Sequence, residues 1–253
     1  MRRGFTCIAL IVVAQLSLSM HVCAARPAGA LDAEAPLKIA VASNFATTAR
    51  ALVAEYSNNS DDEIVLLIGS TGKHTSQIRH GLTVDVFLAA DSVRPALLEQ
   101  SGLVIEGSRF TYALGRLALW SNDPSLIDAK GEVLKSSNFN YLAIANPKTA
   151  PYGVAAKEVL SAMAVSPNLV YGESVGQAFQ FASSGNAELA LVAFAQVKGL
   201  SGGSQWLVPN ELHQAIKQQA VLLNESATAR RFIEFLKSEA ALTLIESHGY
   251  SRP

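Results

Sequence analysis

The sequence contains very little cysteine, with Cys7 and Cys23 as its only two thiols in 253 residues. Both lie in an N-terminal segment that has the features of a signal peptide. The mature chain is therefore expected to have no disulfide and no cysteine-ligated metal. A lipoprotein would use Cys23 as its acylated residue, but the preceding Met20-His21-Val22 does not match the small residue that usually stands before such a cysteine.

Charged residues are also scarce, at 16% of the chain, and 20 basic residues nearly balance 21 acidic ones. No basic stripe with interleaved aromatic residues occurs, so nucleic acid is not expected as a partner. Because the charges balance, long-range electrostatic attraction is not expected to be the main means of capture if the protein binds an anion. Hydrophobic residues make up 49% of the chain. That is enough for a well-buried core in one large domain or in two lobes of about 100 residues each.

Long apolar runs are absent after the N-terminus, so no membrane-spanning helix is predicted in the mature chain. The N-terminus itself has Arg2 and Arg3, followed by an apolar run over residues 5–18 that is too short for a membrane span. Two segments that end in small residues follow, at residues 22–24 and 28–30, and resemble signal-peptide cleavage sites. These features predict a cleaved signal peptide over residues 1–30, export, and a soluble mature protein.

Strand-like and helix-like segments alternate along the mature chain. Buried strands are predicted at residues 37–42, 63–68, 84–89, 117–120, 141–145, 189–193 and 220–223. Helical patterns are predicted at residues 45–56, 71–80, 154–164, 176–183 and 227–246. This alternation predicts an α/β fold with largely parallel sheets.

Small and polar residues occupy four junctions at which an expected strand leads into a helix. They are Ser43-Asn44, residues 69–72, Pro151-Tyr152-Gly153 and residues 172–175. In a parallel sheet these junctions lie at the carboxyl ends of strands, where open α/β folds bind ligands. Each helix start presents unpaired N–H groups and the positive end of a dipole, so four converging starts would hold an anion without a positive side chain. Taken alone, each junction is better explained as an ordinary N-cap.

At these junctions the sequence resembles the periplasmic molybdate-binding proteins that serve ABC importers. The matching segments occur in order and with consistent spacing, at residues 38–45, 69–78, 81–91, 150–153 and 173–175. The resemblance implies a two-lobed periplasmic-binding-protein-like fold, with a mostly parallel sheet flanked by helices in each lobe and a hinge between the lobes. One lobe would comprise residues 31–111 and 222–253, and the other residues 112–221.

The resemblance also implies the ligand and the residues that hold it. Molybdate, and tungstate with it, would lie in the cleft and contact Ser43 or Asn44, then Ser70, Tyr152 and Val175. Ser70 would use its hydroxyl and its backbone N–H, Val175 its backbone N–H, and Tyr152 its phenol, its backbone or both. Molybdenum would be bound only as the oxyanion, with no cofactor. The protein would be a periplasmic monomer that delivers its ligand to a membrane permease with a cytoplasmic ATPase.

One departure from the family concerns a tyrosine that many members carry after the strand matching residues 189–192. This chain has Ala193 and Phe194 there. Tyr152 would then replace that hydroxyl from another loop.

The chemistry of molybdate suits a site made wholly of donors, because the dianion has four acceptor oxygens and no proton. Phosphate recognition would favour an acceptor for the remaining proton. Sulfate is smaller, so a rigid cage of donors would leave some N–H groups under-bonded around it. Another tetrahedral oxyanion such as sulfate remains the second binding hypothesis. The sequence gives no basis for separating molybdate from tungstate.

A different class of function is suggested by residues 172–176, which match G-x-S-x-G, the nucleophile elbow of α/β-hydrolases. A secreted serine esterase would use Ser174 with Glu225 and His248. However, no HGGG-type oxyanion segment lies upstream, and both partners lie in helix-like sequence. Because the motif is also explained as an anion-binding helix start, we expect a binding protein and not an enzyme.

Three further signals have structural explanations. Residues 69–73 resemble a Walker loop, but Leu67 occupies the first glycine position, and Lys73 is expected to be solvated. Asp85 and Asp91 flank a strand, where structural hydrogen bonds are favoured over a catalytic pair. The histidines of the mature chain lack metal-ligand spacing, so surface or capping roles are expected for His74, His80, His213 and His248.

Overall fold

The computed structural model describes residues 35–136 and 138–253. The predicted signal peptide, both cysteines and residues 31–34 of the predicted first lobe lie outside the described residues. Within the described part of the chain, no helix combines the length and apolar character that a membrane crossing needs.

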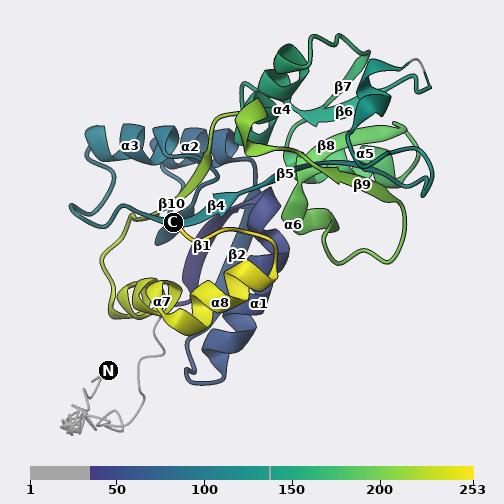
Figure 1. The fold of residues 1–253 in the computed structure, drawn as a ribbon. Helices are drawn as coiled ribbons and strands as arrows, with labels where there is room; N and C mark the ends of the chain where they lie inside the picture. Colours follow the sequence, from purple (N-terminus) through teal and green to yellow (C-terminus); the bar gives the residue numbers. More distant parts are fainter. Residues whose placement is uncertain (1–34, 137) are drawn as a thin grey trace, which may run out of the picture. The chain divides into compact units, whose positions relative to one another are not determined.

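The first sheet has five strands in the order β2-β1-β3-β10-β4 (Figure 1). Its strands are β1 (Leu37–Ala42), β2 (Ile64–Gly69), β3 (Val86–Leu88), β4 (Phe110–Gly115) and β10 (Ile216–Leu222). Strand β1 pairs in parallel with β2 and β3, and β10 pairs antiparallel with β3 and β4. The accompanying helices are η1 (Ser43–Phe45, a 3-10 turn), α1 (Ala46–Ser57), α2 (Thr71–Arg79), α3 (Val93–Gln100), α7 (Ala227–Lys237) and α8 (Glu239–Ser247).

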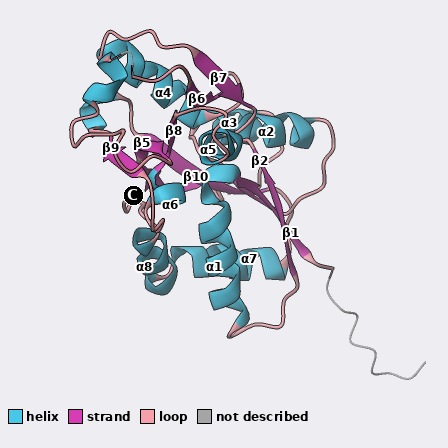
Figure 2. Cartoon of the chain, turned by 90° about the vertical axis from the view of Figure 1, so that its right-hand side faces the viewer, coloured by secondary structure: helices cyan, strands magenta, loops and turns pink. Residues whose placement is uncertain are grey.

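Successive side chains of a strand point to opposite faces of the sheet, and in the central strands both sets are apolar. Both faces of this sheet are therefore covered by helices. Ile39 and Val41 belong to a core with residues of α1, α7 and α8, whereas Ala40 packs with Ile78 of α2 and Leu98 of α3. Figure 1 and Figure 2 show α2 and α3 on one side of the sheet and α1, α7 and α8 on the other.

The second sheet also has five strands, in the order β7-β6-β8-β5-β9. Its strands are β5 (Leu117–Ser121), β6 (Leu142–Ala145), β7 (Leu169–Gly172), β8 (Leu189–Ala193) and β9 (Ser204–Leu207). Strand β6 pairs in parallel with β7 and β8, and β5 pairs antiparallel with β8 and β9. The accompanying helices are α4 (Pro151–Ala162), α5 (Val175–Ser183), α6 (Phe194–Val197) and the 3-10 turns η2 (Glu132–Lys135) and η3 (Asn210–Leu212).

The predicted α/β class and helix-flanked sheets are confirmed, but the prediction of mostly parallel sheets is wrong. In each sheet, two of the four strand pairings described are antiparallel. The parallel pairs come from strand–helix–strand units, which need a crossover connection. The antiparallel pairs involve β4, β5, β9 and β10, the strands that flank the two passages of the chain between the sheets.

The predicted lobe division remains a prediction, but the strands bear on its boundaries. Residues 112–115 and 216–221, which we expected in the second lobe, belong to β4 and β10 of the first sheet. These two strands pair with each other, so both continue past the expected crossing points. The chain therefore passes between the sheets at Arg116 and again between β9 and β10.

The predicted C-terminal helix is divided in two at Ser238. This residue is extended, with φ −70° and ψ 156°, and its hydroxyl accepts a hydrogen bond from the N–H of Ala241 at 3.3 Å. Serine competes for backbone donors in this way and favours a cap over a helix interior. The helix consequently ends at Lys237 and begins again at Glu239.

Candidate anion-binding site

The start of η1 lies against the start of α5. Ser43 and Asn44 follow directly after β1, and Val175 opens α5 after β7. The Ser43 hydroxyl oxygen accepts a hydrogen bond from the N–H of Gly176 at 3.3 Å. Two predicted site segments that lie far apart in the sequence are thereby brought into contact.

The start of α2 is linked in the same way to the loops that precede α4 and α5. The N–H of Gly72 donates to the carbonyl of Thr149 at 2.8 Å. The Thr149 hydroxyl in turn donates to the carbonyl of Glu173 at 3.3 Å. Together with the Ser43–Gly176 contact, these bonds connect the starts of η1, α2, α4 and α5 in one continuous series.

Each of these four starts has a backbone donor that the protein itself does not use. Within the part of the chain that the structure describes, the N–H groups of Asn44, Ser70, Tyr152 and Val175 have no hydrogen-bond partner. The exposed fractions of these residues are only 3%, 6%, 1% and 3%. Because an unpaired buried N–H is costly, donors left free at four linked helix starts point to an acceptor ligand. The positive ends of the helix dipoles favour an anion there.

The two serines of the site can also donate. The Ser70 hydroxyl is the N-cap of α2 and accepts from the N–H of Lys73 at 3.4 Å. The Ser43 hydroxyl accepts from Gly176. A hydroxyl that already accepts a hydrogen bond keeps its own proton free, so both serines are able to donate to a bound oxyanion.

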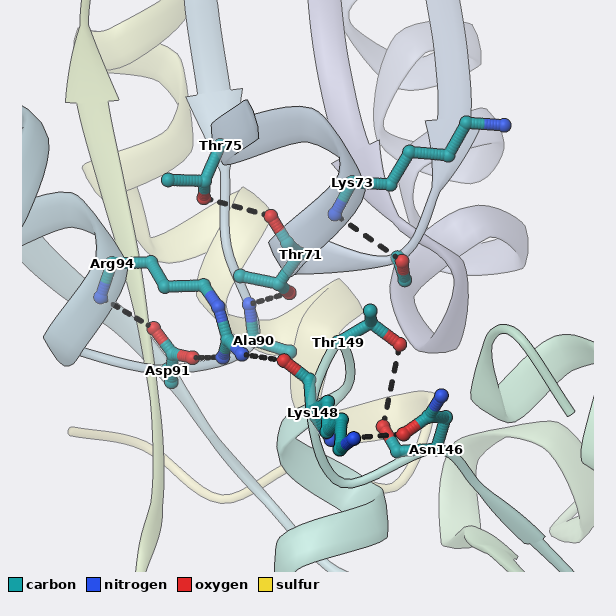
Figure 3. Close-up of polar contacts among 10 residues, drawn as sticks. Thr71, Lys73, Thr75, Ala90, Asp91, Arg94, Asn146, Lys148 and Thr149 are labelled. Carbon is teal, nitrogen blue, oxygen red and sulfur yellow. Dashed lines mark hydrogen bonds and ion pairs between the residues drawn. The ribbon is translucent and has the colours of Figure 1, made fainter. Parts of the chain in front are cut away.

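Positive side chains near these starts are exposed or already paired. Lys73 is exposed, as expected, and Figure 3 shows its side chain extending away from Thr149 and Asn146. Arg94 pairs with Asp91 and donates to the carbonyl of Lys148 at 2.9 Å. The geometry thus favours neutral donors over charge as the means of holding an anion.

The side chains of Asn44 and Tyr152 belong to a buried polar network. Asn44 Nδ2 donates to Gln218 Oε1 at 2.9 Å and to the Tyr250 hydroxyl at 3.2 Å. Gln218 Nε2 donates to the Tyr152 hydroxyl at 3.3 Å. Burial holds the pKa of the Tyr152 phenol well above its ordinary value, so this group stays neutral.

Sequence reasoning missed Gln218 and Tyr250. The sequence offers one signal for Gln218, which is a polar residue beside a strongly apolar strand segment. The structure shows that its side chain is completely buried. Tyr250 donates to the backbone carbonyl of Asn44 at 2.8 Å and packs edge-on against Phe45. Neither contact is visible in the sequence, because the partners lie at opposite ends of the chain.

The residues of the alternative esterase have other partners. The Ser174 hydroxyl is the N-cap of α5 and accepts from the N–H of Gln177 at 3.3 Å. Glu225 forms an ion pair with Arg230. His248 follows the last turn of α8, where burial lowers its pKa. No hydrogen bond of the described residues joins these three groups.

Asp85 and Asp91 form structural hydrogen bonds, as favoured from the sequence. Asp85 accepts from the N–H of Lys38 at 2.8 Å and from Asn224 Nδ2 at 2.9 Å. Asp91 accepts from the N–H of Arg94 at 2.9 Å.

The expectation of surface or capping roles for the histidines is wrong for His74, which lies on the buried face of α2 and packs against Phe87 with 4% of its surface exposed. Burial lowers the pKa of His74 and favours the neutral ring. His213 is also buried. The described residues contain no cluster of three or more histidine, cysteine or acidic groups able to hold a metal ion.

Comparison with known proteins gives consistent relatives. The family described as bacterial extracellular solute-binding protein matches residues 37–251. The molybdate-binding protein ModA of Rhodobacter capsulatus is 44% identical over 218 residues, which cover 83% of this chain and 86% of the relative. Its namesake from Azotobacter vinelandii is 40% identical over 249 residues, covering 94% and 96%.

Solved structures agree with these relatives. The periplasmic molybdate-binding protein of Azotobacter vinelandii superposes with a TM-score of 0.83 at 36% identity, covering 86% of this chain and 99% of that one. The sulfate-binding protein SubI of Mycobacterium tuberculosis H37Rv, at 11% identity and a TM-score of 0.69, shares the fold alone. This chain therefore belongs to the bacterial extracellular solute-binding proteins and, among them, to the family of molybdate-binding proteins.

Proposed function

We propose that the protein captures molybdate, and tungstate with it, and delivers the anion to an ABC-type importer. The observation that carries this proposal is the set of four linked, buried helix starts whose N–H groups have no partner in the described part of the chain. The names of the relatives support molybdate as the ligand and the periplasm as the compartment. The protein would act as a monomer, with a membrane permease and its cytoplasmic ATPase as partners.

The ligand contacts follow from which donors remain available. Ser43 and Ser70 would donate through their hydroxyls, while Asn44, Ser70, Tyr152 and Val175 would donate through backbone N–H groups. The Asn44 amide donates both of its protons, to Gln218 and to Tyr250, so this side chain would not donate to the anion. The Tyr152 phenol accepts from Gln218 and keeps its own proton, but its oxygen lies inside the buried network against Gly115 of β4, so we assign the ligand contact to the Tyr152 N–H. Tyr152 would thus act through its position at the start of α4 and not as a replacement phenol.

An all-donor site of this kind favours a fully ionised oxyanion. Molybdate offers four acceptor oxygens and needs no acceptor from the protein. A protonated phosphate would place a hydrogen among donors, and the smaller sulfate would leave some of the buried N–H groups without good bonds. Both effects should disfavour these common anions.

The proposal is tested by a thermal-shift panel on the mature protein with molybdate, tungstate, sulfate, phosphate and no ligand. Molybdate at 100 times its dissociation constant should add about 2.7 kcal/mol to the free energy of unfolding. Tungstate should act similarly, and sulfate and phosphate hardly at all. A sulfate or phosphate shift as large as that of molybdate would show that the ligand is wrongly assigned.

A further inference from the structure

The side chain of Gln218 is an amide without any solvent exposure, in a strand that is otherwise apolar on its buried positions. It lies at an irregularity of the first sheet. Gln218 and Gln219 of β10 face Ala113 and Thr111 of β4, so Tyr112 is an extra residue without a partner on β10. Such bulges redirect side chains and are common beside functional sites. Here the Tyr112 hydroxyl lies 3.1 Å from Gln218 Oε1.

Both ends of the Gln218 amide are used, and they reach different helix starts. The oxygen accepts from the amide of Asn44, in η1 after the first sheet's β1. The nitrogen donates to the phenol of Tyr152, in the first turn of α4 after the second sheet's β6. Gln218 therefore spans from one half of the anion site to the other.

We propose that Gln218 is a positioning residue for the anion site, because it ties Asn44 to Tyr152 and so fixes two of the four helix starts relative to each other. This inference rests on the proposed function. The residues it holds are those whose backbone N–H groups are free, so their side chains set the position of the donors. A neutral amide suits this role because it accepts at its oxygen and donates at its nitrogen without carrying a charge.

Gly115 supports the same arrangement from β4. A Cβ atom at this position would collide with the Tyr152 hydroxyl and lie 2.7 Å from Gln218 Nε2. The absence of a side chain at Gly115 thus allows the phenol and the amide to meet. The link consequently depends on four elements, η1, β4, β10 and α4.

Two tyrosines provide a matched pair for the experiment. Tyr112 and Tyr152 are both buried phenols within hydrogen-bond distance of the Gln218 side chain. Only Tyr152 belongs to α4 and the second half of the site, whereas Tyr112 also reaches the carbonyl of Ala89 within the first sheet. Tyr112→Phe therefore removes a hydroxyl from the network without cutting the link between the two halves.

The test measures molybdate affinity by titration calorimetry and the melting temperature of the ligand-free protein for Tyr152→Phe, Tyr112→Phe, Gln218→Met and the Gln218→Met/Tyr152→Phe double variant. Tyr152→Phe and Gln218→Met should each weaken binding by roughly tenfold, the scale of one lost buried hydrogen bond. Tyr112→Phe should lower the melting temperature about as much as Tyr152→Phe but keep the wild-type affinity. The double variant should bind no more weakly than Gln218→Met, since both changes cut one link.

Unchanged affinity in Tyr152→Phe, or an equal loss in Tyr112→Phe, would overturn the role of Gln218 even if Gln218→Met does not fold. A wild-type protein that does not bind molybdate would instead refute the proposed function, and this inference with it. The wild-type titration thus separates the two failures.

Discussion

Replacing Ser70 by alanine tests whether neutral donors hold the ligand. Ser70 has two tasks in the proposed site: its hydroxyl caps α2 and donates to the anion. The cap bond to the N–H of Lys73 is long, at 3.4 Å, so its loss should destabilise the protein by only about 0.5–1 kcal/mol. The lost donor to a buried charged acceptor should cost about 1.5–3 kcal/mol of binding free energy, or roughly ten- to a hundredfold in affinity.

Ser174→Ala is the matched control, because it removes an equivalent cap and no proposed ligand contact. Its hydroxyl accepts from the N–H of Gln177 at 3.3 Å at the start of α5. Both variants should therefore lower the melting temperature of the ligand-free protein by similar amounts. Only Ser70→Ala should lose affinity in titration calorimetry.

Lys73→Ala separates charge from hydrogen bonding at the same helix start. The lysine is exposed and points away from Thr149, so its screened charge should change the affinity by no more than about twofold. The titrations are repeated at low and high salt. The reasoning is refuted by a large loss in Lys73→Ala that shrinks as salt is added, or by Ser174→Ala binding as weakly as Ser70→Ala.

Three further outcomes are expected. Gly72→Ala should weaken molybdate binding in calorimetry, because its Cβ would lie 2.8 Å from the carbonyl oxygen of Thr149 and force the α2 start from that loop; full affinity would contradict this. The pKa of Asp62 is lowered to about 2, chiefly by its hydrogen bond with Arg231. The stabilising effect of this carboxylate is therefore complete above about pH 4 and is lost as the pH falls towards 2. The free energy of unfolding in urea should fall over this pH range in the wild type and fall less in Asp62→Asn. A fluorophosphonate should not label Ser174, and stoichiometric labelling of this residue would support the serine esterase hypothesis.

The parts of the fold that could be predicted are those with a strong local signal. Strands β1 and β8 have the same bounds as predicted, because both are short, strongly apolar segments, interrupted only by Lys38 in β1, that lie next to polar junctions. Strand β4 was missed and β10 was predicted only from residue 220. The first half of β10 contains Lys217, Gln218 and Gln219, and its pairing with β4 is decided by long-range contacts, not by local propensity.

The candidate site divides along the same line. Small polar junctions before helices are local features, so the junctions that contain Ser43, Ser70 and Val175 could be selected from the sequence, and the family resemblance then implied these residues within them. The structure brings their helix starts into one linked set. The role of the Gln218 side chain could not be predicted from such local features. Gln218 is 174 residues from Asn44 and 66 from Tyr152, and no pattern in one sequence predicts an amide that spans both separations.

Few side-chain substitutions would remove a proposed ligand donor directly. Most of the proposed ligand donors are backbone N–H groups, which no side-chain substitution removes except proline. Among the ligand contacts, only the hydroxyls of Ser43 and Ser70 can be deleted by a simple replacement. The geometry of the other donors is instead set by residues that do not touch the anion, such as Gln218 through its amide and Gly72 through the space it leaves. Because a cage of neutral donors discriminates by fit and not by charge, discrimination among tetrahedral oxyanions should depend on these supporting residues at least as much as on the ligand contacts themselves.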